Sequence, residues 1–336
     1  MKENTQDLIR EVAPRIHRIL VPLPKNPLRS LNAYLVKGRS SRGDRNLLID
    51  TGFNRPECED TLRAALRELD VDPSETDVFV THLHSDHCGL MRKMALDGCR
   101  VYCSKSDGEL INYAVTRDYW EELDEMYARH GYPSRGKQNM ENHPGWEYNN
   151  REKAEFIPAD EGCVFECGGY AFRAVWTPGH TPGHMCLYDG DKRILFCADH
   201  VLADITPNIT VELGMNNPLK FYSDSLRKTE ALDVDKTLTG HRESPDSLRE
   251  RIAELRAHHA SRLEELMDIL SERATTAYDA ASKMHWDISC KNWDNFPATQ
   301  KWFAVGEAIA HLQYLYGEGR VKRFKSDDLY FYSMAY

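Results

Sequence analysis

The sequence lacks the features that place a protein in a membrane or export it. Among its 336 residues, no apolar run approaches the ~20 residues that a membrane-spanning helix needs. The first twenty residues, MKENTQDLIREVAPRIHRIL, are charged and amphipathic and contain no apolar core of a secretion signal. We therefore expect a cytoplasmic protein that has no membrane partner.

Cysteine is present but without a pairing pattern. The nine cysteines are scattered, and Cys163 and Cys167, in CVFEC, are four positions apart in an apparent strand region. This distribution favours free thiols in a reducing cytoplasm over a disulfide framework. Cys88 follows a cluster of histidines. We interpret it as a small residue at a tight turn, with a reactive thiol as the alternative.

Basic runs are also missing. The chain has 43 Lys and Arg against 53 Asp and Glu, a formal net charge of −10. An acidic protein gains little from counterion release on nucleic acid unless it carries a local basic patch. We therefore expect a small-molecule substrate rather than nucleic acid.

What is present is an alternation of strands and helices. LNAYLVKG and RNLLIDTG look like a hairpin of two apolar strands. CEDTLRAALRELDVD has helical periodicity at Leu62, Ala65, Leu66 and Leu69, and HCGLMRKMALDGC also looks like a helix. DVFVT and CRVYCS look like strands, the first of them buried. This order predicts an α/β layered catalytic domain over residues 1–245.

A helical insertion over about 104–151 interrupts this rhythm. It is rich in acidic and aromatic residues, and its second part, NMENHPGWEYNNREK, looks like a loop. We expect the insertion to border the functional site. Its aromatic residues either line a substrate pocket or pack the insertion onto the domain. They are Tyr113, Tyr119, Trp120, Tyr127 and Tyr132.

The character changes over residues 246–336. Three helices are expected there, the second with Thr as its N-cap, followed by a hairpin in VKRFKSDDLYFYS. This order predicts a winged-helix-like C-terminal domain. Residues 242–336 hold 13 Lys and Arg against 15 Asp and Glu, a net charge of −2, and the third helix is nearly devoid of basic residues. We interpret the domain as a packing or dimerisation element, and a homodimer stays open.

The stretch THLHSDHCGL carries the strongest functional signal. It follows the buried strand DVFVT, so His82 and His84 project from a rigid strand end. Because side chains alternate along an extended chain, these two imidazoles can face the same way. Asp86 and His87 come after the turn and can reach a second point nearby. Imidazole and carboxylate together suit Zn²⁺ or a similar metal.

Three further strand ends carry residues of the same kind. His180 lies in TPGHTPGH, Asp199 in ILFCADH and His241 in KTLTGH. His200, which follows Asp199 directly, is not expected to be a ligand. Four strand ends with ligand residues predict one metal centre.

HLHSDH resembles the His-x-His-x-Asp-His signature of the metallo-β-lactamase superfamily, and LLIDTG resembles the strand and turn that precede it. The resemblance covers about residues 16–245. It implies a four-layer αββα fold, here with the small winged-helix-like domain appended. It also implies that His82, His84 and His180 bind one metal, that Asp86, His87 and His241 bind a second, and that Asp199 bridges them. The second histidine of TPGHTPGH, His184, would support the site without binding metal directly.

The resemblance implies a dinuclear hydrolase. Two divalent cations, Zn²⁺ by expectation and Fe or Mn as alternatives, would share a bridging water, lower its pKa and leave a hydroxide as the nucleophile. Asp86 and Asp199 would be the catalytic carboxylates. Asp50, in LLIDTG, either accepts a hydrogen bond from a ligating histidine or is an ordinary turn residue.

The substrate is left open by fold alone. The segments ADHVLADITPNI, NPL, TGH and AHLQYL resemble a glyoxalase II-related branch, which favours a small thioester, ester or lactone. A lactamase-like endoribonuclease or phosphodiesterase is the second hypothesis, and a DNA-binding metal sensor is the non-enzyme alternative. A true β-lactamase is disfavoured because no export signal is seen. A one-iron sulfur dioxygenase is disfavoured by the complete set of ligands.

Overall fold

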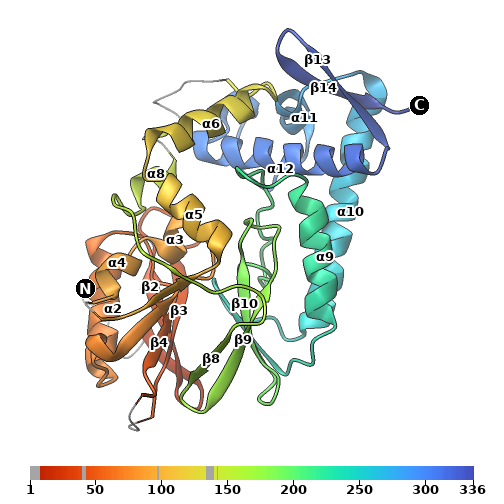
Figure 1. The fold of residues 1–336 in the computed structure, drawn as a ribbon. Coiled ribbons are helices and arrows are strands. Elements are labelled where there is room, and N and C mark those ends of the chain that lie inside the picture. The colour runs from red at the N-terminus through yellow and green to blue at the C-terminus, as the bar shows by residue number, and fades with distance from the viewer. Residues whose placement is uncertain (1–7, 40–42, 97, 134–139, 142) are drawn as a thin grey trace.

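The computed structural model describes residues 8–39, 43–96, 98–133, 140–141 and 143–336. Two β-sheets face one another, and helices cover the outer face of each (Figure 1). The four-layer αββα architecture predicted from the sequence is therefore confirmed.

The first sheet has seven strands in sequence order. They are β1 (Ile9–Ala13), β2 (Ile16–Pro22), β3 (Ser30–Val36), β4 (Asn46–Ile49), β5 (Thr76–Phe79), β6 (Val101–Cys103) and β7 (Ile157–Pro158). Neighbours from β1 to β4 are antiparallel, and those from β4 to β7 are parallel. The predicted hairpin is β3 with β4, where Tyr34 lies opposite Ile49. The structure also contains β1, a strand that the charged N-terminal sequence does not indicate.

The second sheet has five strands in the order β12-β11-β10-β9-β8. They are β8 (Val164–Cys167), β9 (Tyr170–Trp176), β10 (Met185–Asp189), β11 (Ile194–Ala198) and β12 (Lys236–Thr239). Only the pair β11 and β12 is parallel. Every residue of β10 and β11 is buried, because one face of these strands meets the first sheet and the other meets helices. Such burial explains why they read as continuous apolar runs.

Aromatic side chains fill the space between the two sheets. Tyr34 of β3 meets Phe196 of β11 edge to face, with ring centroids 5.2 Å apart, and Phe172 of β9 packs on the same ring. All three side chains are nearly inaccessible to solvent. This core fixes the two sheets relative to each other, and with them the strand ends that carry the predicted ligands.

Helix α2 (Pro56–Glu68) covers the outer face of the first sheet. Proline begins the helix, acidic residues occupy its first turn, and Cys58, Leu62 and Leu66 face the sheet. The helix stops one residue before Leu69, and a 3₁₀ turn, η1 (Pro73–Glu75), leads into β5.

The single helix predicted for HCGLMRKMALDGC is wrong. The chain forms two short helices instead, α3 (Ser85–Cys88) and α4 (Met91–Met94). A Cβ on Gly89 would lie 2.5 Å from the carbonyl oxygen of Ser85 and 2.7 Å from the backbone nitrogen of Asn54. At Gly89 the chain therefore passes too close to the backbone of Asn54 for any side chain to fit, and α3 ends there.

The insertion contains α5 (Lys105–Tyr113), α6 (Arg117–Ala128) and the one-turn helix α8 (Pro144–Glu147). The loop predicted for NMENHPGWEYNNREK therefore contains a short helix, while residues 134–139 and 142 lie outside the described part. Ser104 and Thr116 cap α5 and α6 through their hydroxyl oxygens.

The C-terminal region has the predicted order of helices and strands. After α9 (Pro218–Glu230) come α10 (Leu248–Glu272), α11 (Ala277–Lys283), a 3₁₀ turn η2 (Trp293–Asn295), α12 (Ala298–Gly317), β13 (Val321–Ser326) and β14 (Leu329–Met334). Thr276 caps α11 as predicted. None of the helices in the described ranges is long and apolar enough to cross a bilayer. All nine cysteines of the sequence are free thiols.

One hydrophobic cluster joins the insertion, the second sheet and the C-terminal helices. Tyr127 of α6 stacks on Trp302 of α12 with ring centroids 3.8 Å apart, and Leu195 of β11 and Leu266 of α10 belong to the same cluster. The C-terminal helices therefore share a core with the layer that carries part of the predicted metal centre.

Candidate metal centre

The seven predicted ligands gather at one end of the sandwich. Those of THLHSDH follow the carboxyl end of β5, and the other three follow the ends of β9, β11 and β12. The residues are His82, His84, Asp86, His87, His180, Asp199 and His241. They form three overlapping sets, and within each set the ligand atoms lie within 4.8 Å of one another.

Two of these sets match the two groups of ligands predicted from the sequence. The first ligand group is His82, His84 and His180, and the second ligand group is Asp86, His87 and His241. The third set joins Asp199 to one histidine from each group, His82 and His87.

Asp199 is central to the arrangement. Its Oδ1 lies 3.5 Å from His87 Nε2, and its Oδ2 lies 3.7 Å from His180 Nε2 and 3.4 Å from His241 Nε2. His241 Nε2 also lies 3.4 Å from Asp86 Oδ2. One carboxylate therefore faces histidines of both groups, as a bridging ligand must.

Backbone carbonyls and a carboxylate hold three of the histidines by their Nδ1 atoms. His87 donates to Asp50 Oδ2 over 2.7 Å. His180 donates to the carbonyl of Asn208 over 2.8 Å, and His241 donates to the carbonyl of Ser30 over 2.9 Å. Because Nδ1 makes these contacts, Nε2 is the ring nitrogen that faces the centre in all three histidines, as in metal-binding histidines.

Asp50 contacts more than one part of the ligand loop. Besides His87, it accepts hydrogen bonds from the backbone nitrogen of Thr81 at 2.9 Å and from its hydroxyl at 2.8 Å. That hydroxyl lies 3.0 Å from His82 Nδ1. The structure thus places Asp50 behind two candidate ligand histidines, directly for His87 and through Thr81 for His82.

Three buried polar atoms at the centre have no hydrogen-bond partner among the residues that the structure describes. They are His82 Nε2, His180 Nε2 and Asp199 Oδ1. A buried polar atom left without a partner costs about 1–3 kcal/mol. A cation between these atoms would satisfy all three, so the residues fit a metal of the zinc type.

Charges in the cluster support the same conclusion. Burial lowers the pKa of His84 to about 3 and holds the pKa of His82 well below its usual value, so both stay neutral, the form that binds metal. Burial also disfavours charge on His241, but Asp199 and Asp86 outweigh it and raise its pKa to about 10. The two carboxylates thus stabilise positive charge in the centre, which a bound cation would supply.

Residues 27–241 match the model of the metallo-beta-lactamase superfamily. The chain belongs to this superfamily. Residues 263–335 also match the model of the metallo-beta-lactamase-like C-terminal domain. The superfamily predicted from HLHSDH is therefore confirmed, while the glyoxalase II-related branch and the winged-helix form of the C-terminal domain stay predictions.

Curated relatives are thioesterases and lactamase-like proteins of fungi. The chain is 29% identical over 220 residues to an atrochrysone carboxyl ACP thioesterase of Emericella nidulans, covering 66% of this chain and 53% of that protein. It is 27% identical over 246 residues to a lactamase-like protein of Pestalotiopsis fici, covering 73% and 61%. The chain therefore spans about half to three fifths of the length of these relatives.

Two solved structures match almost the whole chain. A metallo-β-lactamase family protein from Thermus thermophilus has a TM-score of 0.80 and 27% identity, covering 96% of this chain and 100% of that one. A β-lactamase domain protein from Burkholderia ambifaria also has a TM-score of 0.80, with 25% identity and coverage of 97% and 95%. The arrangement of both parts of the chain is therefore shared with other superfamily proteins.

The candidate metal centre is open to solvent on the side of His84 and Asp86. Their side chains are 28% and 13% exposed, whereas that of His87 is fully buried. Glu212 lies on this side, with Oε1 4.0 Å from His84 Nε2, and Tyr119 donates to its Oε2 over 3.0 Å. Burial raises the pKa of Glu212 to about 7. The sequence offers no motif for Glu212, because it lies in an irregular segment.

The remaining histidines lie outside the three ligand sets. His184 lies 2.8 Å from the hydroxyl of Thr177 through Nδ1, and its ring centroid lies 5.1 Å from that of His82. His200 contacts the hydroxyl of Thr229. His184 therefore packs against His82 of the first ligand group, and its supporting role stays a prediction.

The insertion contacts the ligand loop, and most of its aromatic residues pack inward. Ser85 donates to the carbonyl of Pro144 over 3.3 Å, which brings α8 against the loop. Tyr119, Trp120 and Tyr127 are buried in the large cluster. Tyr113 and Tyr132 are partly buried against the same cluster. Tyr119 approaches the centre only through its hydrogen bond to Glu212.

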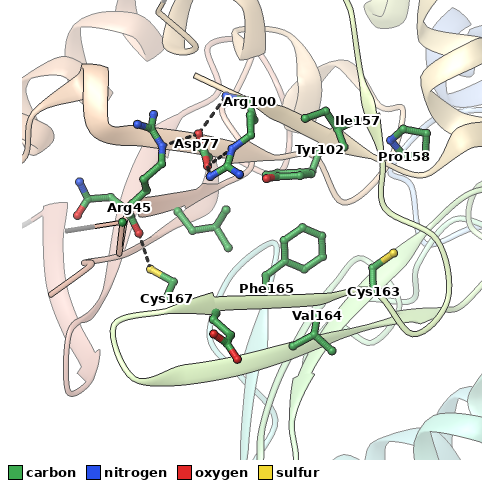
Figure 2. A pocket seen from close by; sticks show the side chains of 14 residues that line it. Arg45, Asp77, Arg100, Tyr102, Ile157, Pro158, Cys163, Val164, Phe165 and Cys167 are labelled. Atoms are coloured by element: carbon green, nitrogen blue, oxygen red, sulfur yellow. Dashed lines mark hydrogen bonds and ion pairs between the residues drawn. The ribbon is translucent and has the colours of Figure 1, made fainter. Parts of the chain in front are cut away.

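A separate cavity of about 480 Å³ lies between the two sheets at the other end of the strands (Figure 2). It is lined by Arg45, Asp77 and Arg100, which lie at the amino ends of β4, β5 and β6. Asp77 accepts from Arg45 Nε at 3.0 Å and from Arg100 Nε at 2.8 Å, so both guanidinium groups are already paired. Because the predicted ligands follow the carboxyl end of β5, this cavity is not part of the metal centre.

Proposed function

We propose that this protein is a metal-dependent hydrolase of thioesters. The observation that carries the proposal is the pair of ligand groups around Asp199, with three histidines within 3.4–3.7 Å of its carboxylate. We assign one divalent cation to the first ligand group and a second to the second ligand group, Zn²⁺ in both by preference. The thioester is favoured over an ester or a lactone because the curated relatives include ACP thioesterases.

The chain's own residues define how such a reaction would run. Bound cations would supply a water of lowered pKa and a Lewis acid for the developing oxyanion. The carboxylate of Asp86, on the open side, would accept a hydrogen bond from the attacking water. Asp199 would hold the two halves of the centre together. The thiol that leaves has a pKa of about 8.5, so it departs as a thiolate and needs no strong acid.

The C-terminal region supports the choice against a nuclease. Its basic run contains Lys322, Arg323 and Lys325, but Lys325 pairs with Asp328 at 2.6 Å. The guanidinium of Arg323 lies over two tyrosine rings, 4.8 Å from each centroid. Two of the three basic side chains in this run therefore already have partners within the chain. The nine free thiols fit a reducing compartment such as the cytoplasm.

The test is a panel of initial rates with and without a chelator. It contains acyl-CoA and glutathione thioesters, homoserine lactones, β-lactams and structured RNA. We expect thioester hydrolysis that the chelator abolishes and added Zn²⁺ restores. Hydrolysis of RNA alone, or thioester hydrolysis that the chelator leaves unchanged, would overturn the proposal.

A further inference from the structure

A buried carboxylate outside the ligand set joins the two loops of the first ligand group. Asp107 lies in the first turn of α5 and is inaccessible to solvent. It accepts three hydrogen bonds. Oδ2 accepts from the backbone nitrogen of Leu83 at 2.9 Å and from the hydroxyl of Thr181 at 2.6 Å, and Oδ1 accepts from the backbone nitrogen of Gly183 at 2.6 Å.

The donors to Asp107 come from two segments that are far apart in sequence. Leu83 stands between His82 and His84, on the loop after β5. Thr181 follows His180 directly, on the loop after β9. The first loop belongs to the first sheet and the second loop to the second sheet. A single carboxylate therefore ties together the two loops that supply the whole first ligand group.

Close backbone packing at the same place is a second observation. A Cβ on Gly183 would lie 2.0 Å from the hydroxyl oxygen of Ser104 and 2.7 Å from the backbone nitrogen of Asp107. The loop after β9 therefore approaches the start of α5 more closely than any side chain would allow. Ser104 also caps α5 by accepting from the Asp107 backbone.

We propose that Asp107 is a positioning residue that holds the His180 loop against the His82–His84 loop and so shapes the first metal position. The second ligand group is held differently, by Asp50 behind His87 and the Ser30 carbonyl behind His241. The role is therefore selective for one of the two metal positions. The proposal rests on the metal centre proposed above and is independent of which substrate is hydrolysed.

The test is metal binding by the full-length Asp107→Asn protein. Asparagine has nearly the same shape but only one acceptor oxygen, so its amide group would face at least one of the three donors. We expect one of two metal equivalents to bind about 10- to 100-fold more weakly while the other keeps its affinity. The measurement is titration of metal-free protein with Zn²⁺ by calorimetry, and with Co²⁺ by visible absorption.

Asp189→Asn is the matched control. Asp189 is also buried and accepts backbone hydrogen bonds from Ala171 and Lys192, but it lies at the end of β10, away from the ligands. Its variant should lose stability and keep both metal equivalents. Thr181→Val removes one of the three donors to Asp107 and should weaken binding of the same metal equivalent to a smaller extent. This variant tests the inference if Asp107→Asn does not fold.

Two results would overturn the inference. One is unchanged affinity for both equivalents in Asp107→Asn, or in Thr181→Val when it alone folds. The other is an equal loss at both positions. Failure of the proposed function looks different, because the parent protein would then bind two metal equivalents without hydrolysing thioesters, or would bind none.

Discussion

Asp199 is the residue on which both ligand groups converge. Replacing it with alanine removes the carboxylate that the Nε2 atoms of His87, His180 and His241 face. Asp86 beside His241 and Asp50 behind His87 then remain as the nearby carboxylates. We expect metal affinity to fall by more than the 10- to 100-fold that is typical when only an outer partner is lost, and hydrolysis to be lost with it. Metal analysis and rate measurements check this.

The control for Asp199→Ala is the folding of the C-terminal helices, which should be unaffected. Their cluster contacts, such as Tyr127 on Trp302, do not involve the carboxylate. Far-ultraviolet circular dichroism should therefore match that of the parent. Full activity in a metal-depleted Asp199→Ala protein would show that the centre described above is not the catalytic one.

Single residues differ in how far the sequence could reveal them. The ligand types at four strand ends are visible because each follows a recognisable apolar strand, and the structure brings all seven together. Asp107 is not visible, because its partners lie 24, 74 and 76 positions away and an acidic residue in a first helical turn is ordinary. Glu212 is missed for a related reason, since it meets the site through His84 and Tyr119, which are also far from it in the sequence.

At the scale of elements, α12 supports the segment that supplies the Asn208 carbonyl to His180. A Cβ on Gly306 of α12 would lie 2.2 Å from Tyr127 Oη and 2.9 Å from Thr210 Cγ2. Gly306→Val should therefore overpack this contact and lower the free energy of unfolding by about 1–3 kcal/mol. Urea denaturation measures the change.

Gly190→Ala is the control for Gly306→Val. The nearest atom to a Cβ at Gly190 lies 3.5 Å away, and its φ angle is not positive, so the added methyl group meets only ordinary contacts. The midpoint of unfolding should stay close to that of the parent. Equal stability of the two variants would mean that α12 can shift away from Tyr127 without loss.

Some helices and strands can be predicted from the sequence pattern, and others cannot. The hairpin of β3 and β4 and the C-terminal helices are visible because their patterns are long and bounded by turn residues. The break between α3 and α4 is invisible, because it depends on the backbone of Asn54 passing close to Gly89. The two-residue strand β7 is too short to leave a pattern.

At the scale of the whole molecule, buried histidines make stability depend on pH. Burial lowers the pKa of His130 and of His311 to about 4, whereas an exposed histidine has a pKa of about 6.5. Between these values the unfolded chain binds more protons than the folded chain, so stability is lost as the pH falls from 6.5 towards 4. We expect a loss of ~2 kcal/mol per histidine between pH 7 and pH 5.

The variant His311→Gln removes one of these contributions, together with the contact of His311 Nε2 with His259 Nδ1 at 3.0 Å. Glutamine can still donate to the carbonyl of Glu307, which His311 contacts at 2.8 Å, but it does not titrate. Urea denaturation of metal-free parent and variant at pH 7 and pH 5 should give a smaller loss of stability for the variant. Parallel pH profiles for the two proteins would contradict the assignment.

The shared core of the second sheet and the C-terminal helices has a consequence for synthesis. Domains generally fold as units, and the amino-terminal parts of a chain are made first. Here β11 and β12 are complete well before Leu266 of α10 and Trp302 of α12, which belong to the same cluster as Leu195. A growing chain therefore carries part of this apolar cluster uncovered until its last helices leave the ribosome. Chains that end early should depend on chaperones or be degraded.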